Sequence, residues 1–271
     1  MSRIQTRFAQ LKGRPGLVTF IAAGDPDFET CQSLLNALPG AGADIIELGM
    51  PFTDPAADGP AIQAASLRAL KNGASMAKTL KLVQGFRLQD KETPIILMGY
   101  FNPVYSWGVE RFAKDAAAAG VDGVIIVDLP PEEAGELVPH TKAAGLDFIV
   151  LTTPTTGDIR LPTVLENASG FIYYVSIAGV TGADAAKDND VQRAMERIRR
   201  HTDLPVAVGF GVKTAENVRA TGAIADAVVV GSAIVSELAA HLDPSGQAKA
   251  GLVESVTAFV GELAKGLSRR D

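Results

Sequence analysis

The chain has 271 residues, 47% of them hydrophobic and 21% charged, which is the composition of an ordinary globular protein with a large core. Its net charge of −6 and pI near 5.2 argue against a nucleic-acid or anionic-membrane surface, but they leave room for a phosphate site built from backbone amides. No apolar run approaches the length of a membrane span, and a single cysteine, Cys31, cannot form an intramolecular disulfide, so a mature cytoplasmic protein is expected.

The N-terminus predicts an amphipathic helix. Residues 1–24 carry basic residues and no acid, as a mitochondrial transit peptide would. However, Ile4, Phe8 and Leu11 fall on one helical face, and the segment runs directly into a strand pattern. We therefore interpret it as a helix that covers one end of a core.

Short apolar runs then alternate with amphipathic segments along the chain. The runs are nearly continuous, which is typical of parallel strands covered on both faces. The expected strands are Leu17–Ala22, Asp44–Leu48, Ile95–Met98, Val124–Val127, Phe148–Leu151, Phe171–Val175, Pro205–Val208 and Ala227–Val230. Expected helices between them include Gln63–Leu70, Val109–Ala119 and Asp190–Arg199. Several strands follow an AG-x-D turn, which indicates a helix C-cap glycine in a repeated β/α unit.

This pattern predicts the α/β class and a single (β/α)8 TIM barrel with an extra N-terminal helix, occupying residues 1–271 as one domain. A doubly wound open sheet is the competing fold. It would normally have fewer strands, and a nucleotide-binding version would carry a G-x-G-x-x-G turn after the first strand. The corresponding turn here is AAGDPDFET, which lacks that spacing.

The segment 44–63 places an acid inside an apolar strand. Glu47 lies within the run DIIEL, and Asp54 and Asp58 follow in a loop rich in Gly and Pro. Burying an ionisable group is costly unless it is paired or neutral, and a carboxyl group with a raised pKa suits proton transfer. A structural glutamate bound to backbone amides or to an arginine is the alternative, and this segment alone leaves both open.

The loops after the last two expected strands indicate an anion site. In VAVGFGVKT and VVVGSAIVS, Gly211 and Gly231 let the backbone approach a ligand, and Ser232 lies where a short helix should start. Barrels often bind phosphate at these two loops, although the glycines can also serve tight turns. The Gly-rich loop 176–183 can close over a ligand, with Thr181 as a hydrogen-bonding group.

Several stretches together resemble one family. LGMPFTDPAADGPAIQ, MGYFNPVYSWG, GVDGVIIVDLPPEE, FIYYVSIAGVTG and GFGVKT are similar to the α subunit of tryptophan synthase, over nearly the whole chain to about Ser236. The resemblance implies a barrel that cleaves indole-3-glycerol phosphate to indole and glyceraldehyde 3-phosphate, without a metal or organic cofactor in this chain. It also implies a pyridoxal-phosphate β subunit as partner, which receives indole through a tunnel in an αββα complex.

The resemblance assigns roles to individual residues. Glu47 matches the acid/base glutamate, and Asp58 matches the aspartate that accepts the indole N–H. Tyr173 matches an active-site tyrosine near Glu47, or is an aromatic core residue. The expected indole slot comprises Phe20, Met98, Tyr100, Ile125, Leu151, Phe210 and Thr181. The expected phosphate-binding residues are Gly182, Gly211, Gly231 and Ser232.

Two positions depart from the family pattern. Ile177 stands where many members carry Arg, which argues against an ionic latch by this loop, and Gly99 replaces bulkier residues, which would loosen the slot. Asp54 resembles a partner-contact residue or forms a plain Asp-Pro turn. Asp128 belongs to an expected β-subunit contact or is a structural hydrogen-bonding residue.

Three other functions are alternatives. A metal-dependent epimerase needs His ligands at strand ends, but His140, His201 and His241 fall in helices or surface turns. A Schiff-base aldolase needs a lysine on a strand, and the expected strands hold none. A binding or activating subunit with negligible catalysis of its own stays open. Loops 51–60 and 176–190 are expected to be mobile without ligand and ordered with it.

Overall fold

The structure is a computed structural model that describes residues 1–176, 184–209 and 211–267. Its strands are β1 (Gly16–Ala22), β2 (Ile45–Gly49), β3 (Ile95–Gly99), β4 (Gly123–Ile126), β5 (Asp147–Phe148), β6 (Val150–Thr152), β7 (Ile172–Val175), β8 (Val206–Gly209) and β9 (Ala227–Val230). Its helices are α1 (Arg3–Leu11), α2 (Phe28–Ala37), α3 (Pro60–Lys71), α4 (Met76–Arg87), α5 (Phe101–Trp107), α6 (Val109–Ala119), the 3-10 helix η1 (Pro131–Glu136), α7 (Val138–Ala143), α8 (Leu161–Leu165), α9 (Asp184–Arg199), α10 (Ala215–Gly222), α11 (Ser232–Ala240) and α12 (Leu252–Ala264).

The described strands form one parallel sheet that nearly closes into a barrel. Their order is β5-β4-β3-β2-β1-β9-β8-β7-β6, with every pairing parallel. The two ends of this order, β5 and β6, are consecutive pieces of one expected strand, separated only by Ile149. The order contains no reversal, so the barrel prediction is confirmed and the doubly wound alternative is wrong.

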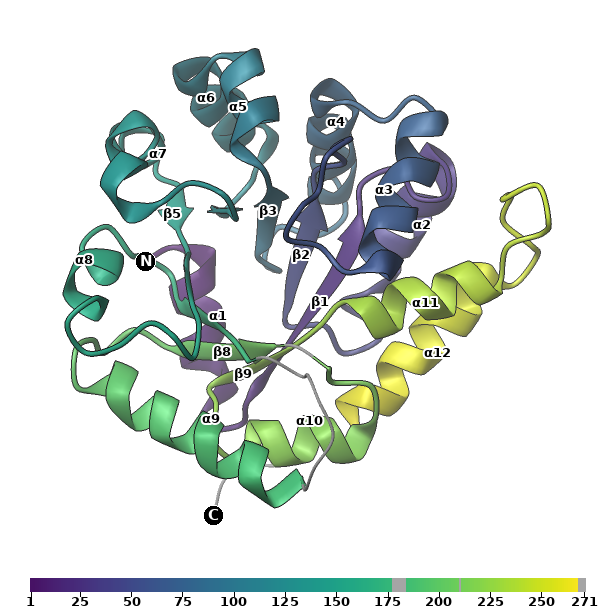
Figure 1. Cartoon of the computed structure of the whole chain (residues 1–271). Coiled ribbons are helices and arrows are strands. Elements are labelled where there is room, and N and C mark those ends of the chain that lie inside the picture. Colours follow the sequence, from purple (N-terminus) through teal and green to yellow (C-terminus); the bar gives the residue numbers. More distant parts are fainter. Residues whose placement is uncertain (177–183, 210, 268–271) are drawn as a thin grey trace.

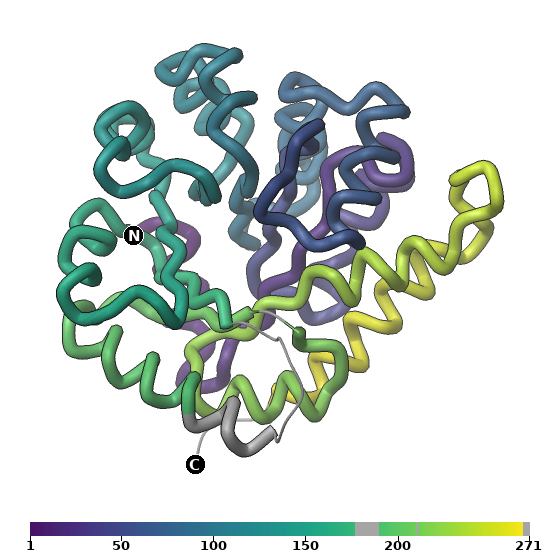
Figure 2. The backbone as a smooth tube through the Cα atoms, viewed as in Figure 1, coloured from purple at the N-terminus to yellow at the C-terminus, as the bar shows by residue number. Residues whose placement is uncertain are grey.

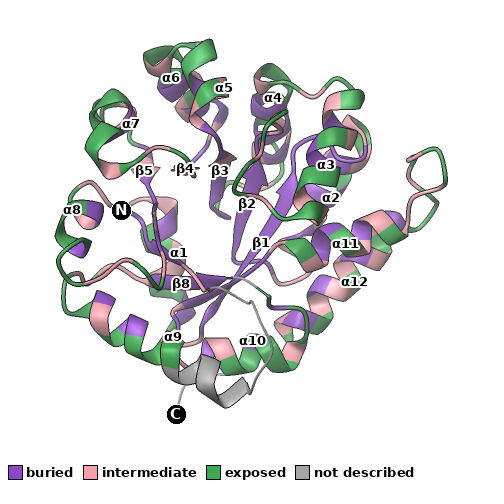
Figure 3. Ribbon diagram, viewed as in Figure 1, coloured by how far each residue is buried: buried purple, intermediate pink, exposed green. Residues whose placement is uncertain are grey.

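Helices surround the sheet on its outer side (Figure 1). The tube view shows the chain passing once around the ring, from purple through teal and green to yellow (Figure 2). The strands are buried, and the helices expose their outward faces (Figure 3). This arrangement explains the continuous apolar runs, because alternate strand residues face the barrel interior and the helix layer.

Helix α1 covers the amino-terminal end of the barrel, as the sequence predicts. A capping box between Ser2 and Gln5 starts the helix. Ile4 is fully buried in the inner cluster, and the ring of Phe8 lies 5.9 Å from that of Phe171. The guanidinium of Arg3 forms an ion pair with Asp122 at 2.8 Å.

The aspartates of the AG-x-D turns have a second function, which is to connect neighbouring strands at their starts. The side-chain carboxylates of three aspartates at strand starts each accept a hydrogen bond from the backbone N–H of a residue at the start of the neighbouring strand. The backbone N–H of each aspartate donates in return to the carbonyl of that same residue. The side-chain bonds are Leu17 to Asp44 at 2.9 Å, Ile95 to Asp122 at 2.8 Å and Val206 to Asp226 at 2.9 Å. We call these three residues the strand-start aspartates.

Each strand-start aspartate also pairs with an arginine. The pairs are Arg14–Asp44 at 2.7 Å, Arg87–Asp122 at 2.6 Å and Arg199–Asp226 at 3.2 Å. All lie at the amino-terminal ends of strands, the face of such barrels associated with stability rather than chemistry. Within residues 1–176, 184–209 and 211–267, every helix is too short or too polar to cross a bilayer.

Candidate active site

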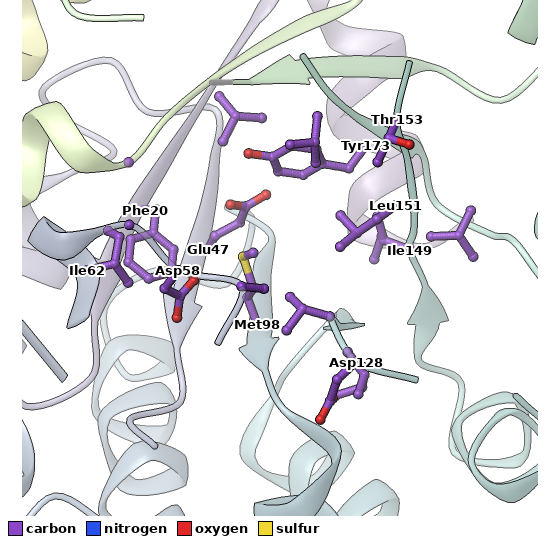
Figure 4. A pocket seen from close by; sticks show the side chains of 18 of the residues that line it. Phe20, Glu47, Asp58, Ile62, Met98, Asp128, Ile149, Leu151, Thr153 and Tyr173 are labelled. Atoms are coloured by element: carbon purple, nitrogen blue, oxygen red, sulfur yellow. The ribbon is translucent and has the colours of Figure 1, made fainter. Parts of the chain in front are cut away.

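Many of the residues expected to be functional line a cavity at the carboxyl ends of the strands. Its volume is about 1200 Å³, and residues of β1 through β7 and of β9 contribute to its wall. The side chain of Glu47 projects into the space between Tyr173, Met98 and Leu151 (Figure 4). Active sites of (β/α)8 barrels occur at this end.

Glu47 is the buried acid of the site. Residues of β2 alternate, so Ile45 and Glu47 face the interior while Ile46 and Leu48 pack toward the helices. The Glu47 side chain is 1% exposed, and its buried Oε1 has no hydrogen-bonding partner in the described part of the chain. Burial raises the pKa of this carboxyl group to about 8, so it is mostly protonated at neutral pH.

Tyr173 lies beside Glu47, on β7. Its side chain is nearly buried, and its pKa is raised well above 10 by burial and by the nearby charge of Glu47. The phenol therefore stays protonated and can donate a hydrogen bond. The hydroxyl occupies space left by the missing side chain of Gly209.

Asp58 belongs to the loop between β2 and α3. Burial raises its pKa, and a hydrogen bond from Tyr100 partly offsets that effect. The backbone N–H of Ala57 donates to the hydroxyl oxygen of Tyr100 at 2.9 Å, and the Tyr100 ring lies 5.3 Å from that of Phe52. Tyr100 is not among the described cavity-lining residues and instead holds this loop.

Phe20, Met98 and Leu151 line the apolar wall of the cavity, at the positions where the sequence places them. Ile125 does not reach the cavity surface formed by the described residues. It is fully buried in the inner core of the barrel. Three expected ligand residues, Thr181, Gly182 and Phe210, lie outside the described residues, as does Ile177.

The candidate anion site lies at the amino terminus of α11. Gly211, Gly231 and Ser232 line the cavity, and the described structure shows no side-chain cap at Gly231. The first N–H groups of α11 are therefore available to an anion, and the helix dipole favours negative charge there. Lys213 also lines the cavity and adds a cation.

Three further residues have structural explanations. The carboxylate of Asp128 accepts a hydrogen bond from the backbone N–H of Phe101 at 2.7 Å, at the start of α5. Met50 fills the space beside Gly99, on the helix side of the sheet, so Gly99 opens no room in the cavity. Thr53 donates a hydrogen bond to Asp54, which is exposed.

Several lining residues were not predicted from the sequence, namely Ile62, Ile149, Val175, Lys213 and Val229. Three of them could have been predicted from strand alternation, in which every second residue faces the same side of the sheet. Ile149 lies two residues before Leu151, Val175 two residues after Tyr173, and Val229 two residues after Ala227. Nothing in the local pattern of α3 singles out Ile62.

Metal-ligating residues are not gathered in the described ranges. No group of three or more His, Cys, Asp or Glu residues there could hold an ion. His140 lies in α7, His201 follows α9, and His241 ends α11, as expected. The described strands carry no lysine.

The chain matches the family model for the tryptophan synthase alpha chain over residues 8–267. A tryptophan synthase alpha chain from Legionella pneumophila is 36% identical, with a TM-score of 0.87 and coverage of 98% of this chain and 97% of that one. A chain of Mycobacterium tuberculosis tryptophan synthase is 33% identical, with a TM-score of 0.86 and coverage of 100% and 99%. A protein of Aquifex aeolicus is 37% identical, with a TM-score of 0.88 over the full length of both chains.

These matches confirm the resemblance found in the sequence. Because the family model spans nearly the whole chain, the chain belongs to the tryptophan synthase alpha chain family, and it is a lyase that carries out the alpha reaction of tryptophan biosynthesis.

Proposed function

We propose that Glu47 carries both proton transfers when indole-3-glycerol phosphate is cleaved to indole and glyceraldehyde 3-phosphate. The observation that supports this role most directly is its buried carboxyl group, whose Oε1 is unpaired and whose pKa is raised to about 8. A carboxylic acid that is neutral at the working pH can act as a general acid.

In the first step, the neutral carboxyl group of Glu47 donates its proton to the ring carbon that bears the side chain. The ring becomes an indolenine with positive charge on its N–H. Asp58 accepts the hydrogen bond of that N–H and stabilises the developing charge. The half-buried position of Asp58 strengthens this interaction, because fewer water molecules screen it.

In the second step, the Glu47 carboxylate removes the proton of the side-chain hydroxyl next to the ring. The carbon–carbon bond breaks, its electron pair restores the aromatic indole, and the oxygen becomes the aldehyde carbonyl of glyceraldehyde 3-phosphate. Glu47 ends protonated, as it began. Glu47 is both the acid and the base, and all protons and electrons are accounted for. The scheme therefore uses no metal or organic cofactor in this chain.

The remaining site residues bind and orient the substrate. The amides of Gly211, Gly231 and Ser232 hold the phosphate, together with Gly182 from the undescribed loop. Phe20, Met98 and Leu151 form the indole slot, with Phe210 and Thr181 proposed to complete it, while Ile125 packs in the barrel core and Tyr100 holds the loop of Asp58. Tyr173 keeps its phenol protonated beside Glu47, where it can donate a hydrogen bond.

We assign a pyridoxal-phosphate β subunit as the partner, in an αββα complex that receives the indole. The family membership supports this assignment, because similar chains occur in structures of tryptophan synthase. Loops 51–60 and 176–190 are proposed to order when ligand binds. A cytoplasmic location agrees with the buried, unpaired Cys31.

The test is indole release from indole-3-glycerol phosphate by the purified chain, with and without a cognate β subunit. Glu47→Gln should lower kcat by roughly 10³-fold or more, and Asp58→Asn should lower it severely. Glu254→Gln, the same change on an exposed position of α12, is the control. If the Glu47→Gln complex keeps its activity, the chain is a binding or activating subunit instead.

A further inference from the structure

A second cavity lies at the amino-terminal ends of the strands, opposite the mouth that holds the candidate active site. Its volume is about 270 Å³. It lies between α1, the connection from α2 to β2, the start of β3 and the end of α12, and its lining includes Arg7, Arg14, Asp44, Thr93 and Leu267. We call this space the basal cavity. Segments that are far apart in the sequence meet around it.

Arg7 brings a positive charge to the basal cavity that has no counterion in the described part of the chain. Its Nε is buried and makes no hydrogen bond there, and Arg7 takes part in no ion pair. The nearby arginines differ, because Arg3 pairs with Asp122 at 2.8 Å and Arg14 pairs with Asp44 at 2.7 Å. A buried donor without an acceptor destabilises a fold, and a charged one does so more strongly. The guanidinium of Arg7 therefore favours an acceptor that enters the cavity.

The acceptors in the wall of the basal cavity already have donors. Asp44 accepts Nη2 of Arg14 through Oδ1, and it accepts the N–H of Leu17 through Oδ2 at 2.9 Å. At the end of α12, the carbonyl of Ala264 accepts the N–H of Leu267 at 3.0 Å. The charged residues in the described lining are two arginines and this one aspartate, so one positive charge is left uncompensated.

The size and the charge of the basal cavity suit a small oxyanion. A water molecule occupies about 30 Å³ in the liquid, so a cavity of about 270 Å³ has room for a multi-atom ion and some water. A guanidinium presents its N–H donors in a planar fork that matches the oxygens of a phosphate or a carboxylate. Arg7 and Arg14 are both partly buried, which reduces the screening of their charges by solvent.

We infer that the basal cavity binds a small oxyanion, a phosphate or a carboxylate, between the guanidinium groups of Arg7 and Arg14. The bound ion connects α1 to the start of β2 and to the end of α12, so it stabilises the amino-terminal end of the barrel. This site is separate from the loops after β8 and β9, which lie at the other end of the strands.

The local test follows the Nε–H signal of Arg7 by proton–nitrogen correlation NMR of the full chain, while inorganic phosphate is added at constant ionic strength. Arg7→Lys removes this signal but keeps the charge, and so assigns it. The signal should shift with half-saturation at roughly 1–10 mM phosphate, as expected for a few charge-assisted hydrogen bonds. Because the observed group belongs to Arg7, phosphate bound at the mouth does not produce this shift.

Titrations with sulfate, acetate and chloride identify the chemistry of the occupant. A shift with sulfate supports a tetrahedral oxyanion such as phosphate, and a shift with acetate supports a carboxylate. An equal shift with chloride would overturn the inference, because chloride offers a single atom and acts here through its charge alone. The absence of a shift up to roughly 100 mM phosphate, where general screening is already strong, would overturn it as well.

Urea unfolding of Arg7→Gln tests whether the ion stabilises the fold. Phosphate at ten times the half-saturating concentration should lower the unfolded fraction of the native chain about tenfold more than that of Arg7→Gln. The difference between the two chains is the readout, since the site proposed at the mouth also binds phosphate. Arg193→Gln, which removes an exposed arginine of α9, should respond as the native chain does. Equal responses of the native chain and Arg7→Gln would overturn the site, and if Arg7→Gln does not fold, the NMR titration decides.

Discussion

The hydroxyl of Tyr173 occupies the space in which a Cβ on Gly209 would stand, so the bare backbone of β8 sets the position of the tyrosine on β7. A Cβ there would also approach that of Val229 to 2.9 Å. Gly209 therefore has a packing function, because it leaves room for the Tyr173 hydroxyl.

Gly209→Ala should displace the Tyr173 ring toward Glu47. We expect a loss of unfolding free energy of about 1–3 kcal/mol from overpacking, together with a lower kcat. Denaturant unfolding and the indole assay measure the two effects. In a double-mutant cycle, Tyr173→Phe should recover part of the lost stability, because it removes the overlapping oxygen.

Gly135→Ala is the matched control, because a Cβ at Gly135 meets no atom within 4 Å. Equal losses for the two alanine variants would contradict a cost that comes from the tyrosine contact. Complete additivity in the cycle would contradict the coupling of Tyr173 and Gly209.

Glu47 should make the stability of the fold depend on pH. Burial raises its pKa to about 8, from 4.5 for an unburied glutamate. Between these values the folded chain keeps a proton that the unfolded chain releases, so the unfolding free energy falls as pH rises and levels off above about pH 8. Glu47→Gln should abolish this fall and be more stable than the native chain at about pH 9, by on the order of 5 kcal/mol at most.

Urea unfolding at about pH 4 and pH 9 tests this pH dependence, since native and Glu47→Gln chains should be similarly stable at the lower value. The exposed substitution Glu254→Gln serves as the control and should show the same difference from the native chain at both. A parallel pH dependence of native and Glu47→Gln stability would contradict the raised pKa.

Asp122 should contribute to stability without contributing to catalysis. It pairs with Arg87 and Arg3 and accepts a hydrogen bond from the Ile95 N–H, at the barrel end remote from Glu47. Asp122→Ala leaves the Arg87 guanidinium without its charged partner and should cost about 3–5 kcal/mol. Urea titrations measure the loss, and kcat of the folded fraction should stay unchanged.

Glu110→Ala is the comparison for Asp122→Ala, because it breaks the exposed ion pair with Lys114 on α6. Exposed pairs of this kind contribute roughly 0–1 kcal/mol. A loss from Asp122→Ala no larger than that would mean that the strand-start aspartates do not hold the barrel end together.

Most of the fold could be predicted from the sequence, because the strands of a parallel sheet that is buried on both faces have nearly continuous apolar sequences. The expected strand at Leu17–Ala22 is β1 to within one residue, and Val109–Ala119 is α6. The split at Ile149 could not be predicted, since FIVLT is one unbroken apolar run and hydropathy does not record hydrogen-bond pairing.

The site was predictable where a residue's chemistry is unusual for its position. Glu47 stands out as an acid within an apolar strand, and its place in the cavity follows from strand alternation. Tyr100 was harder to place, because the chain turns into α5 immediately after β3 and carries the phenol toward Ala57. The direction of the Tyr100 side chain depends on where α5 begins. A prediction based only on the position of a residue at the end of a strand does not include this.

Tyr100 should control Asp58 through the loop it holds. Its hydroxyl accepts the Ala57 N–H and lowers the pKa of Asp58 by donating to that carboxylate. Tyr100→Phe removes both interactions, so the pKa of Asp58 rises and the acid limb of the pH–kcat profile should move to higher pH. A roughly tenfold lower kcat at neutral pH should accompany it, as the loop loses a fixed contact. Tyr105→Phe, an exposed phenol on α5, is the matched control. A Tyr100→Phe profile that superimposes on the native one would show that Asp58 is positioned by other contacts.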